Sequence, residues 1–481
     1  MSKAAERMSR VDTAWLRMDT EGNLMTIVGV WLLEPRVAYE AVVERFANAL
    51  LKYRRFRQKV VEDAVGTSWV DDPQFDICHH VLRESLPRAR GRSPEQALQS
   101  RVGELCAEPL DRSRPLWQMH VVEALDGPGG MQSALIMRIH HCIADGIALM
   151  SVMNAITDGG KPPPVRAAKP GDGSDWLSEA VLRPLTDLTV KALDMTGRGV
   201  SKSMEALSHP RSLGVHSLDG SMEVARIGFQ VINDVAALAL MPDDSATRLK
   251  GRAQRVKKVA WGPPLPLDEV KAIGRALGSS INDVLLASVA GAIGAYLRDK
   301  GEDVAGKQIR AMVPVNLRPL NQAHQLGNRF GLVPLTLPIG VENPVERVYA
   351  VRARMNELKG SYQPLLAFGV LALSGLFIKP VQDAVINLFA KKATAVMTNV
   401  PGPSVPLKFC GATVKQVMFW VPASGDIGMG VSILSYGGGV QFGLITDAKL
   451  CPDPEQIVQR FGPEFEKLLM TTLMLPWQEA A

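Results

Sequence analysis

The alternation of apolar and polar residues along the chain predicts a mixture of strands and helices. Short apolar runs bounded by polar, glycine or proline residues are typical of buried strands, and such runs occupy 25–33, 134–139, 308–317 and 331–337. Longer segments with apolar residues every three or four positions predict helices at 39–53, 94–108, 267–277, 284–300 and 454–474. Because strands and helices alternate over most of the length, the pattern favours an α/β fold.

One junction between a strand and a helix carries the strongest chemical signal. The apolar run 134–139 leads directly into His140 and His141, and Asp145 and Gly146 precede the next helical pattern. An imidazole near neutral pKa can take a proton from a hydroxyl or thiol, and a carboxylate nearby can hold its ring in one orientation. A pair of structural histidines at a strand end is the alternative, but Asp145-Gly146 at this offset favours a catalytic loop.

This loop resembles a known signature. The pattern His140-His141-x-x-x-Asp145-Gly146 is similar to the HHxxxDG motif of the CoA-dependent acyltransferase superfamily, and three further motifs narrow the resemblance to the bacterial wax ester synthase/diacylglycerol acyltransferase family. The motifs are Pro115-Leu116-Trp117, Ser280-Ile281-Asn282-Asp283-Val284 and Asn399-Val400-Pro401-Gly402-Pro403. The resemblance implies two chloramphenicol-acetyltransferase-like α/β domains, each with a mixed sheet flanked by helices, and an active-site channel between them.

The same resemblance implies an activity and a set of site residues. The expected reaction moves a long-chain acyl group from acyl-CoA to a long-chain alcohol, giving a wax ester, or to diacylglycerol, giving triacylglycerol for storage. His141 would be the general base of a direct transfer without an acyl-enzyme, with His140 beside it, and Asp145 would shape the loop. Asn282 has two readings, a helix cap or a donor that stabilises the oxyanion, and the resemblance favours the second.

Several residues bear on competing functions. The family usually has histidine where this chain has Thr26, so any role of that side chain is lost here. The second pair, His79-His80, lacks a following Asp-Gly, and we interpret it as structural. Because neither pair has metal-ligand spacing or suitable partners, we expect no metal and no cofactor, with acyl-CoA as co-substrate only. Cys142, next to the histidines, reads as a small buried residue.

Composition limits the class of protein and its organisation. The chain has 481 residues, 46% hydrophobic and 21% charged, with a net charge of +5, which predicts a globular protein of two domains and does not argue for nucleic-acid binding. A stretch rich in Gly, Pro and Lys after Thr157 marks a connection. We therefore expect an N-terminal acyltransferase domain at 1–165, a linker with helices at 166–215, and a C-terminal acyltransferase-like domain at 216–481.

The cysteine content, the N-terminus and the apolar runs predict where in the cell the protein is found. Five cysteines without CxxC spacing and a polar N-terminus suit the cytoplasm. The longest apolar run, 364–378, is shorter than the roughly 20 residues that span a bilayer. We expect peripheral contact with the inner membrane or with lipid inclusions, through that run and the basic cluster 52–59, whose default reading is a solvated helix end.

Two other functions remain open at this stage. One is a condensation-type acyltransferase that uses carrier-protein thioesters, although the chain contains no carrier domain. The other is a non-catalytic lipid-droplet protein, against which the complete His140–Gly146 motif weighs. The sequence does not choose between alcohol and diacylglycerol as acceptor.

Overall fold

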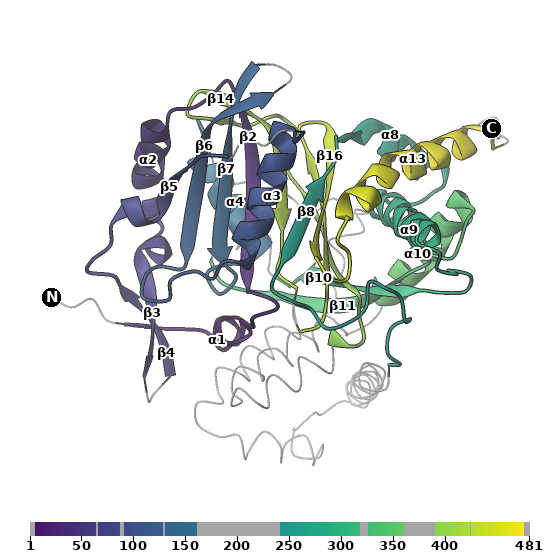
Figure 1. Cartoon of the computed structure of the whole chain (residues 1–481), viewed down its shortest axis with the longest axis horizontal. Helices are drawn as coiled ribbons and strands as arrows, with labels where there is room; N and C mark the ends of the chain where they lie inside the picture. The colour runs from purple at the N-terminus through teal and green to yellow at the C-terminus, as the bar shows by residue number, and fades with distance from the viewer. Residues whose placement is uncertain are drawn as a thin grey trace, which may run out of the picture.

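Two mixed β-sheets lie side by side in the computed structural model, with helices on their outer faces (Figure 1). The structure describes residues 5–63, 66–86, 91–127, 130–160, 241–317, 326–359, 390–423 and 425–475. Both sheets combine parallel and antiparallel neighbours, as the sequence pattern predicts for an α/β protein.

The first sheet has the strand order β13-β14-β2-β7-β6-β5. Its strands are β2 (Thr26–Glu34), β5 (Val81–Glu84), β6 (Trp117–Gly127), β7 (Gly130–His140), β13 (Lys408–Phe409) and β14 (Ala412–Trp420). β7 is the central antiparallel partner of β2 and β6, and all of its residues from 132 to 140 are buried. The sheet therefore delivers His140 and His141 at the end of its most buried strand.

The second sheet has the strand order β11-β10-β12-β15-β16-β8, with β9 beside β16. Its strands are β8 (Lys257–Trp261), β9 (Leu265–Pro266), β10 (Ile309–Asn316), β11 (Phe330–Leu337), β12 (Ala395–Pro401), β15 (Met429–Tyr436) and β16 (Gly439–Asp447). A third, small sheet consists of β1 (Glu6–Arg7), β4 (Gly66–Asp71) and β3 (Gln58–Asp63). The turn between β15 and β16 uses Gly437 and Gly438 with φ of 58° and 83°, as the glycine run predicts.

Helices cover the sheets, and α2, α3, α8, α9 and α13 lie where the periodic patterns predict them. They are α1 (Arg10–Arg17), α2 (Tyr39–Asn48), α3 (Pro94–Ala107), α4 (Gly146–Ile156), α8 (Leu267–Ala276), α9 (Ile281–Asp299), α10 (Pro344–Lys359) and α13 (Pro454–Leu473). Their starts follow from local chemistry: Ser93 with Gln96, and Ser280 with Asp283, form capping boxes at α3 and α9. The predicted helix 39–53 is shorter, because the chain continues from Leu50 in short 3-10 turns.

α9 is the central helix of the second half. It is long and apolar enough to cross a membrane by length and composition alone. Its apolar side chains are instead buried against the second sheet and against α13 and α10, which is the packing of a core helix.

Three expectations fall on residues that the structure does not describe. The domain boundaries at 165/166 and 215/216 and the apolar run 364–378 all lie outside the described ranges. They stay predictions. One feature adds to the predicted division: β13 and β14 come from residues 408–420, yet they complete the sheet formed by the first 140 residues.

Candidate active site

His141 packs against two aromatic rings at the end of β7. Its backbone N–H donates to the carbonyl of Met25 at 2.7 Å, which fixes the chain as it leaves the sheet. Its imidazole stacks on the indole of Trp15, with centroids 4.2 Å apart and ring planes 12° apart, and Phe330 lies at 5.5 Å. The side chain is buried, and this burial lowers the pKa of His141 to about 4. The ring is therefore neutral at pH 7.

The two ring nitrogens of His141 have different surroundings. Nδ1 lies 2.9 Å from Oδ1 of Asn328. The amide nitrogen of Asn328 donates to Oδ1 of Asp12 and to the carbonyl of His141, both at 2.8 Å. Among the residues that the structure describes, the ring's one side-chain partner is at Nδ1, and no partner is found for Nε2. A neutral imidazole with one engaged and one open nitrogen can accept a proton from a substrate.

His140 is engaged at both nitrogens. Nδ1 accepts a hydrogen bond from the backbone N–H of Cys142 at 3.1 Å, and Nε2 faces Oδ2 of Asp19 at 3.4 Å. Burial alone would raise the pKa of Asp19, but hydrogen bonds from His140, the Met25 amide and Arg112 outweigh it and hold that pKa at about 2. His140 thus fixes the turn, while His141 presents the available nitrogen.

The Pro115-Leu116-Trp117 motif supports this turn from the neighbouring strand. The carbonyl of Leu116 accepts from the backbone N–H of His140 at 2.9 Å. Trp117 is fully buried, donates through Nε1 to the carbonyl of Phe56, and stacks on His80. His80 is thereby a packed core residue, in agreement with the structural reading of the second histidine pair.

Asp145 ties the histidine loop to the second half of the chain. One carboxylate oxygen caps α4 by accepting from the Ala148 amide at 2.9 Å, and the other accepts from the Arg329 amide at 3.1 Å. Ala144 and Gly327 form a parallel bridge, supported by a bond from the Asp145 amide to the Gly327 carbonyl. The carboxylate shapes the loop, and it also anchors the segment 326–329 beside His141.

Asn282 lies exposed in the first turn of α9. Ser280 provides the helix cap, and the Oδ1 of Asn282 accepts from Nδ2 of Asn399 at 2.7 Å. Two of the predicted motifs therefore meet. No bond joins this pair to His141 among the described residues, so a role of Asn282 at the oxyanion stays a prediction.

Cys142 follows the two histidines and is fully buried. Burial raises its pKa well above the ordinary value, so the side chain is a neutral thiol rather than a thiolate nucleophile. In the described ranges, no group of three His, Cys, Asp or Glu side chains is arranged to hold a metal ion.

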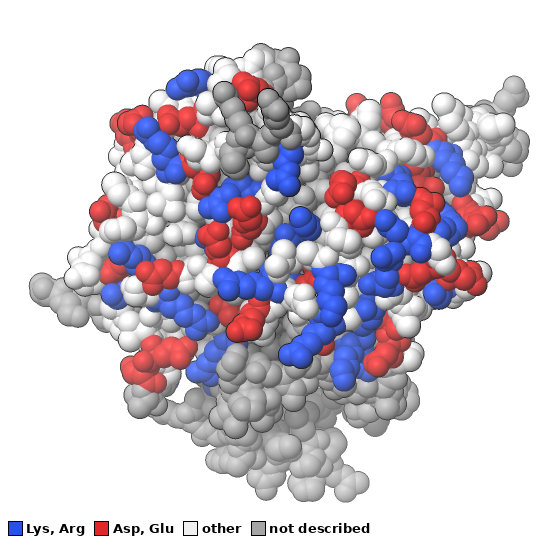
Figure 2. Space-filling model, in the orientation of Figure 1, with Lys and Arg blue, Asp and Glu red and all other residues white. Residues whose placement is uncertain are grey.

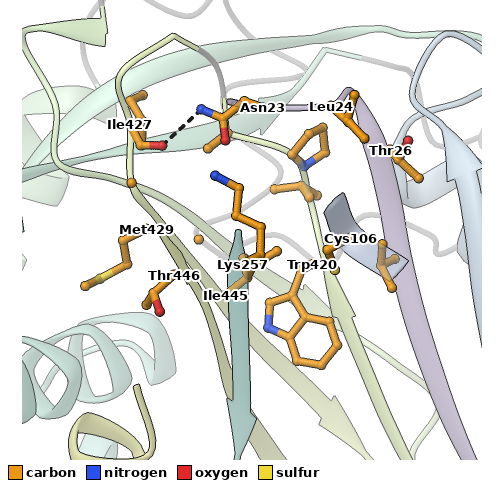
Figure 3. A pocket seen from close by; sticks show the side chains of 16 residues that line it. Asn23, Leu24, Thr26, Cys106, Lys257, Trp420, Ile427, Met429, Ile445 and Thr446 are labelled. Atoms are coloured by element: carbon orange, nitrogen blue, oxygen red, sulfur yellow. Dashed lines mark hydrogen bonds between the residues drawn. The ribbon is translucent and has the colours of Figure 1, made fainter. Parts of the chain in front are cut away.

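A small cavity opens between the two sheets, close to the start of β2 (Figure 3). Lys257 extends from β8 into it toward Asn23, whose amide donates to the carbonyl of Ile427. Thr26 lines the cavity and is the direct partner of His140 in the β2–β7 ladder. Apolar side chains from both sheets form the rest of the wall, among them Val28, Trp420, Met429 and Ile445. The cavity therefore lies against β2, the strand that pairs with the histidine strand β7.

Family comparison identifies the chain. The family model for the wax ester synthase/diacylglycerol acyltransferase catalytic domain matches residues 8–285, and the model for the C-terminal domain of the same family matches residues 326–469. The chain belongs to this family. It is therefore an acyltransferase, as the HHxxxDG motif predicts.

A curated relative and a solved structure are similar to this chain over nearly its whole length. A probable diacylglycerol O-acyltransferase of Mycobacterium tuberculosis is 27% identical over 462 residues, covering 94% of this chain and 93% of the relative. The wax ester synthase/diacylglycerol acyltransferase of Marinobacter aquaeolei superposes with a TM-score of 0.65 at 21% identity, covering 98% of this chain and all of that one.

More distant acyltransferases share only the fold. A trichothecene 15-O-acetyltransferase of Fusarium sporotrichioides superposes with a TM-score of 0.58 at 13% identity, covering 96% of this chain and 94% of the other. The predicted fold, two chloramphenicol-acetyltransferase-like domains with mixed sheets, is confirmed.

Two residues of this acyltransferase site escaped the sequence reasoning. Asn328 lies in Gly327-Asn328-Arg329, which reads as a turn between strands, and Asp12 lies in the opening helix. They are separated by 316 positions. Neither segment contains a sequence pattern that indicates a catalytic role. Only the folded chain brings both of them to His141.

Proposed function

We propose that the protein transfers a long-chain acyl group from acyl-CoA to the hydroxyl of a long-chain alcohol or of diacylglycerol. The observation that carries the proposal is the open Nε2 of a buried, neutral His141 on the family's motif loop. The curated relatives named as diacylglycerol O-acyltransferases support this substrate class.

Charge supports acyl-CoA as the donor. The segment 250–258 contains five Lys and Arg residues and no Asp or Glu. Its Lys257 lines the cavity, where it is paired with Asp447. Lys and Arg side chains also gather below the middle of the face seen in Figure 2. Such a cationic region attracts the phosphate groups of CoA.

The proposed reaction proceeds in one direct transfer. Nε2 of His141 takes the proton of the acceptor hydroxyl while that oxygen attacks the thioester carbonyl carbon. The tetrahedral intermediate then collapses, the C–S bond breaks, and the CoA thiolate receives the proton from His141. General-base catalysis of this kind contributes about 10²–10⁴-fold to the rate. The neutral, buried thiol of Cys142 supports direct attack over an acyl-enzyme.

The first test measures CoA release from palmitoyl-CoA with hexadecanol or dipalmitoylglycerol as acceptor. We expect release to require an acceptor and to fall at least about 100-fold in His141→Ala, because the base is gone. His79→Ala is the matched control: it belongs to the other histidine pair, is exposed, and should leave the rate unchanged.

The outcomes separate the candidate functions. Release that proceeds without acceptor, or that survives in His141→Ala, contradicts direct transfer through this base. Turnover only with a carrier-protein thioester indicates a condensation-type enzyme. Inactivity of the wild type together with droplet binding indicates a coat protein.

We also propose a cytoplasmic location with peripheral contact to the inner membrane or lipid inclusions, because the acceptors are insoluble. Within the basic cluster 52–59, Arg54, Arg55 and Lys59 are held in ion pairs with carboxylates, whereas Lys52 and Arg57 are exposed. Replacing Lys52 and Arg57 by Gln should weaken sedimentation with anionic vesicles, by about 1 kcal/mol for each charge. Unchanged binding would remove this cluster from the proposal.

A further inference from the structure

We propose that Asn328 is a positioning residue that fixes the tautomer of His141, and that Asp12 in turn fixes the orientation of Asn328. The inference deepens the proposed function, since it explains why one particular nitrogen of His141 is the base. None of the three residues is adjacent to another in sequence, and Asn328 comes from the opposite half of the chain.

The orientation of the Asn328 amide follows from its neighbours. One end of the amide lies 2.8 Å from two groups that can only accept hydrogen bonds at pH 7, the carboxylate of Asp12 and the carbonyl of His141. Only the NH2 group can satisfy both acceptors. The amide oxygen must therefore be the atom that faces Nδ1 of His141 at 2.9 Å.

This orientation decides where the proton of the imidazole resides. An amide oxygen accepts but cannot donate, so Nδ1 of His141 must carry the hydrogen, and Nε2 keeps the lone pair. The bond between the His141 amide and Met25 fixes the main chain, and the stacked Trp15 fixes the plane of the ring, so Nδ1 stays at the position that faces Asn328. Without Asn328 the ring keeps its hydrogen bond to the backbone of His141 but loses the amide acceptor, so the preference for the tautomer with its base at Nε2 is weaker and part of the population carries hydrogen on Nε2 instead.

Asp12 adds a charge behind the amide. When Nε2 takes the acceptor proton the ring becomes a cation, and the Asn328 oxygen stays bonded to its Nδ1–H. The carboxylate of Asp12 lies at the far end of that same amide, where it favours the cation. Asp12 itself is held by Ser9 at the start of α1 and by the nearby positive charge of Arg55.

The architecture makes this support depend on both halves of the chain. Asn328 is placed by the bridge between Ala144 and Gly327 and by the bond from the Arg329 amide to Asp145. His141 and Asp12 belong to the first half. His141 therefore adopts the tautomer with hydrogen on Nδ1 when segment 326–329 packs against the histidine loop.

The direct test is ¹⁵N NMR of the full-length protein labelled at histidine, because ring nitrogen shifts distinguish the two tautomers. The wild type should give His141 with a protonated Nδ1 and an unprotonated Nε2, assigned by its loss in His141→Ala. Asn328→Ala should give a mixture of tautomers. This reading requires no turnover, so it stands apart from the assay of the proposed function.

Kinetics test the consequence. Asn328→Ala should lower kcat by about 10–100-fold, the usual effect of removing a residue that orients a functional histidine, while the KM for acyl-CoA changes less than about twofold. Thr394→Val is the control: it removes another buried side-chain bond, to Asp244, and should leave kcat unchanged.

A double exchange provides the rescue. Combining Asp12→Asn with Asn328→Asp moves the donor to position 12 and keeps an acceptor at position 328 for Nδ1, although the bond to the His141 carbonyl is lost. We expect partial recovery of the lost kcat relative to Asn328→Ala, with the acid limb of the pH–rate profile moved to higher pH because a carboxylate now contacts the ring. A single wild-type tautomer with hydrogen on Nε2, or an unchanged kcat in Asn328→Ala, would overturn the inference.

Discussion

At the scale of single residues, the site contains two buried ionisable groups whose pKa values shift in opposite directions. Burial lowers the pKa of His141 to about 4 and raises that of Asp12 to about 6. Both shifts favour the neutral form of the group, as desolvation requires. At pH 7 the imidazole is neutral and Asp12 is ionised, which is the state that proton transfer to Nε2 needs.

These shifts predict a compensation in stability. Below pH 6.5 the unfolded chain protonates His141, whereas the folded chain does so only near pH 4. The contribution of His141 to the free energy of unfolding therefore falls as the pH falls. Asp12 keeps its proton up to about pH 6 in the folded chain and releases it near pH 3.8 in the unfolded chain. The contribution of Asp12 to the free energy of unfolding therefore rises as the pH falls. Between pH 4 and 6 the two terms cancel.

Asp12→Asn removes the contribution of Asp12, so the pH dependence of stability that comes from His141 should become measurable. From pH 6 down to pH 4 the variant should lose about 1.4 kcal/mol of unfolding free energy per pH unit relative to the wild type. Denaturant unfolding at pH 4, 5 and 6 measures this slope. His141→Ala should show the opposite slope, and parallel curves for all three proteins would mean that neither pKa is shifted as described.

At the scale of elements, apolar periodicity located most strands and helices near the site because each has one regular buried face. β7, β10, β11, α3, α8 and α9 all form where the pattern predicts them, within a few residues. β14 was not predicted. A register shift between Val414 and Gln416 interrupts its period-two alternation, and Lys415 is exposed at that point. A bulge of this kind hides a strand from pattern analysis.

The connection 326–329 beside His141 has no apolar periodicity, so its position could not be predicted in this way. Segment 326–329 contains Gly327 with φ of 105°, a conformation that glycine adopts readily. Its sequence therefore predicts a turn, but a turn propensity carries no information about which distant loop it docks against. Asn328 was for this reason read as part of a connection and not as part of the site.

At the scale of the whole molecule, the two halves are joined by β13 and β14, which cross from the second half into the first sheet, as well as by the histidine loop. β14 pairs with β2 over most of its length, from Glu34 to Val28. Phe409 of β13 is fully buried against Trp31 and Phe46 of the first half. The first sheet is therefore incomplete without residues 408–420.

The dependence of the first sheet on β13 and β14 predicts whether fragments of the chain fold. Residues 1–165 expressed alone should fail to fold into a soluble unit, because β2 becomes a long, apolar edge strand and the Phe409 site is left empty. Co-expression with residues 166–481 should restore soluble complex, measured by co-purification and protease resistance. A stable, monomeric fragment 1–165 with dispersed NMR signals would show that β14 is dispensable for the first sheet.

The sequence by itself determined the class of fold, the catalytic motif and the family, since these depend on local periodicity and on residues close together in the chain. His140, His141 and Asp145 lie within one loop, and a local pattern is enough to find them. Tertiary structure alone decided which residues support His141 and which of its ring nitrogens has no partner among the described residues. Asp12, Asn328 and His141 are brought together by strand pairing and loop docking between the halves, and long-range contacts of this kind leave no periodic signal in the sequence.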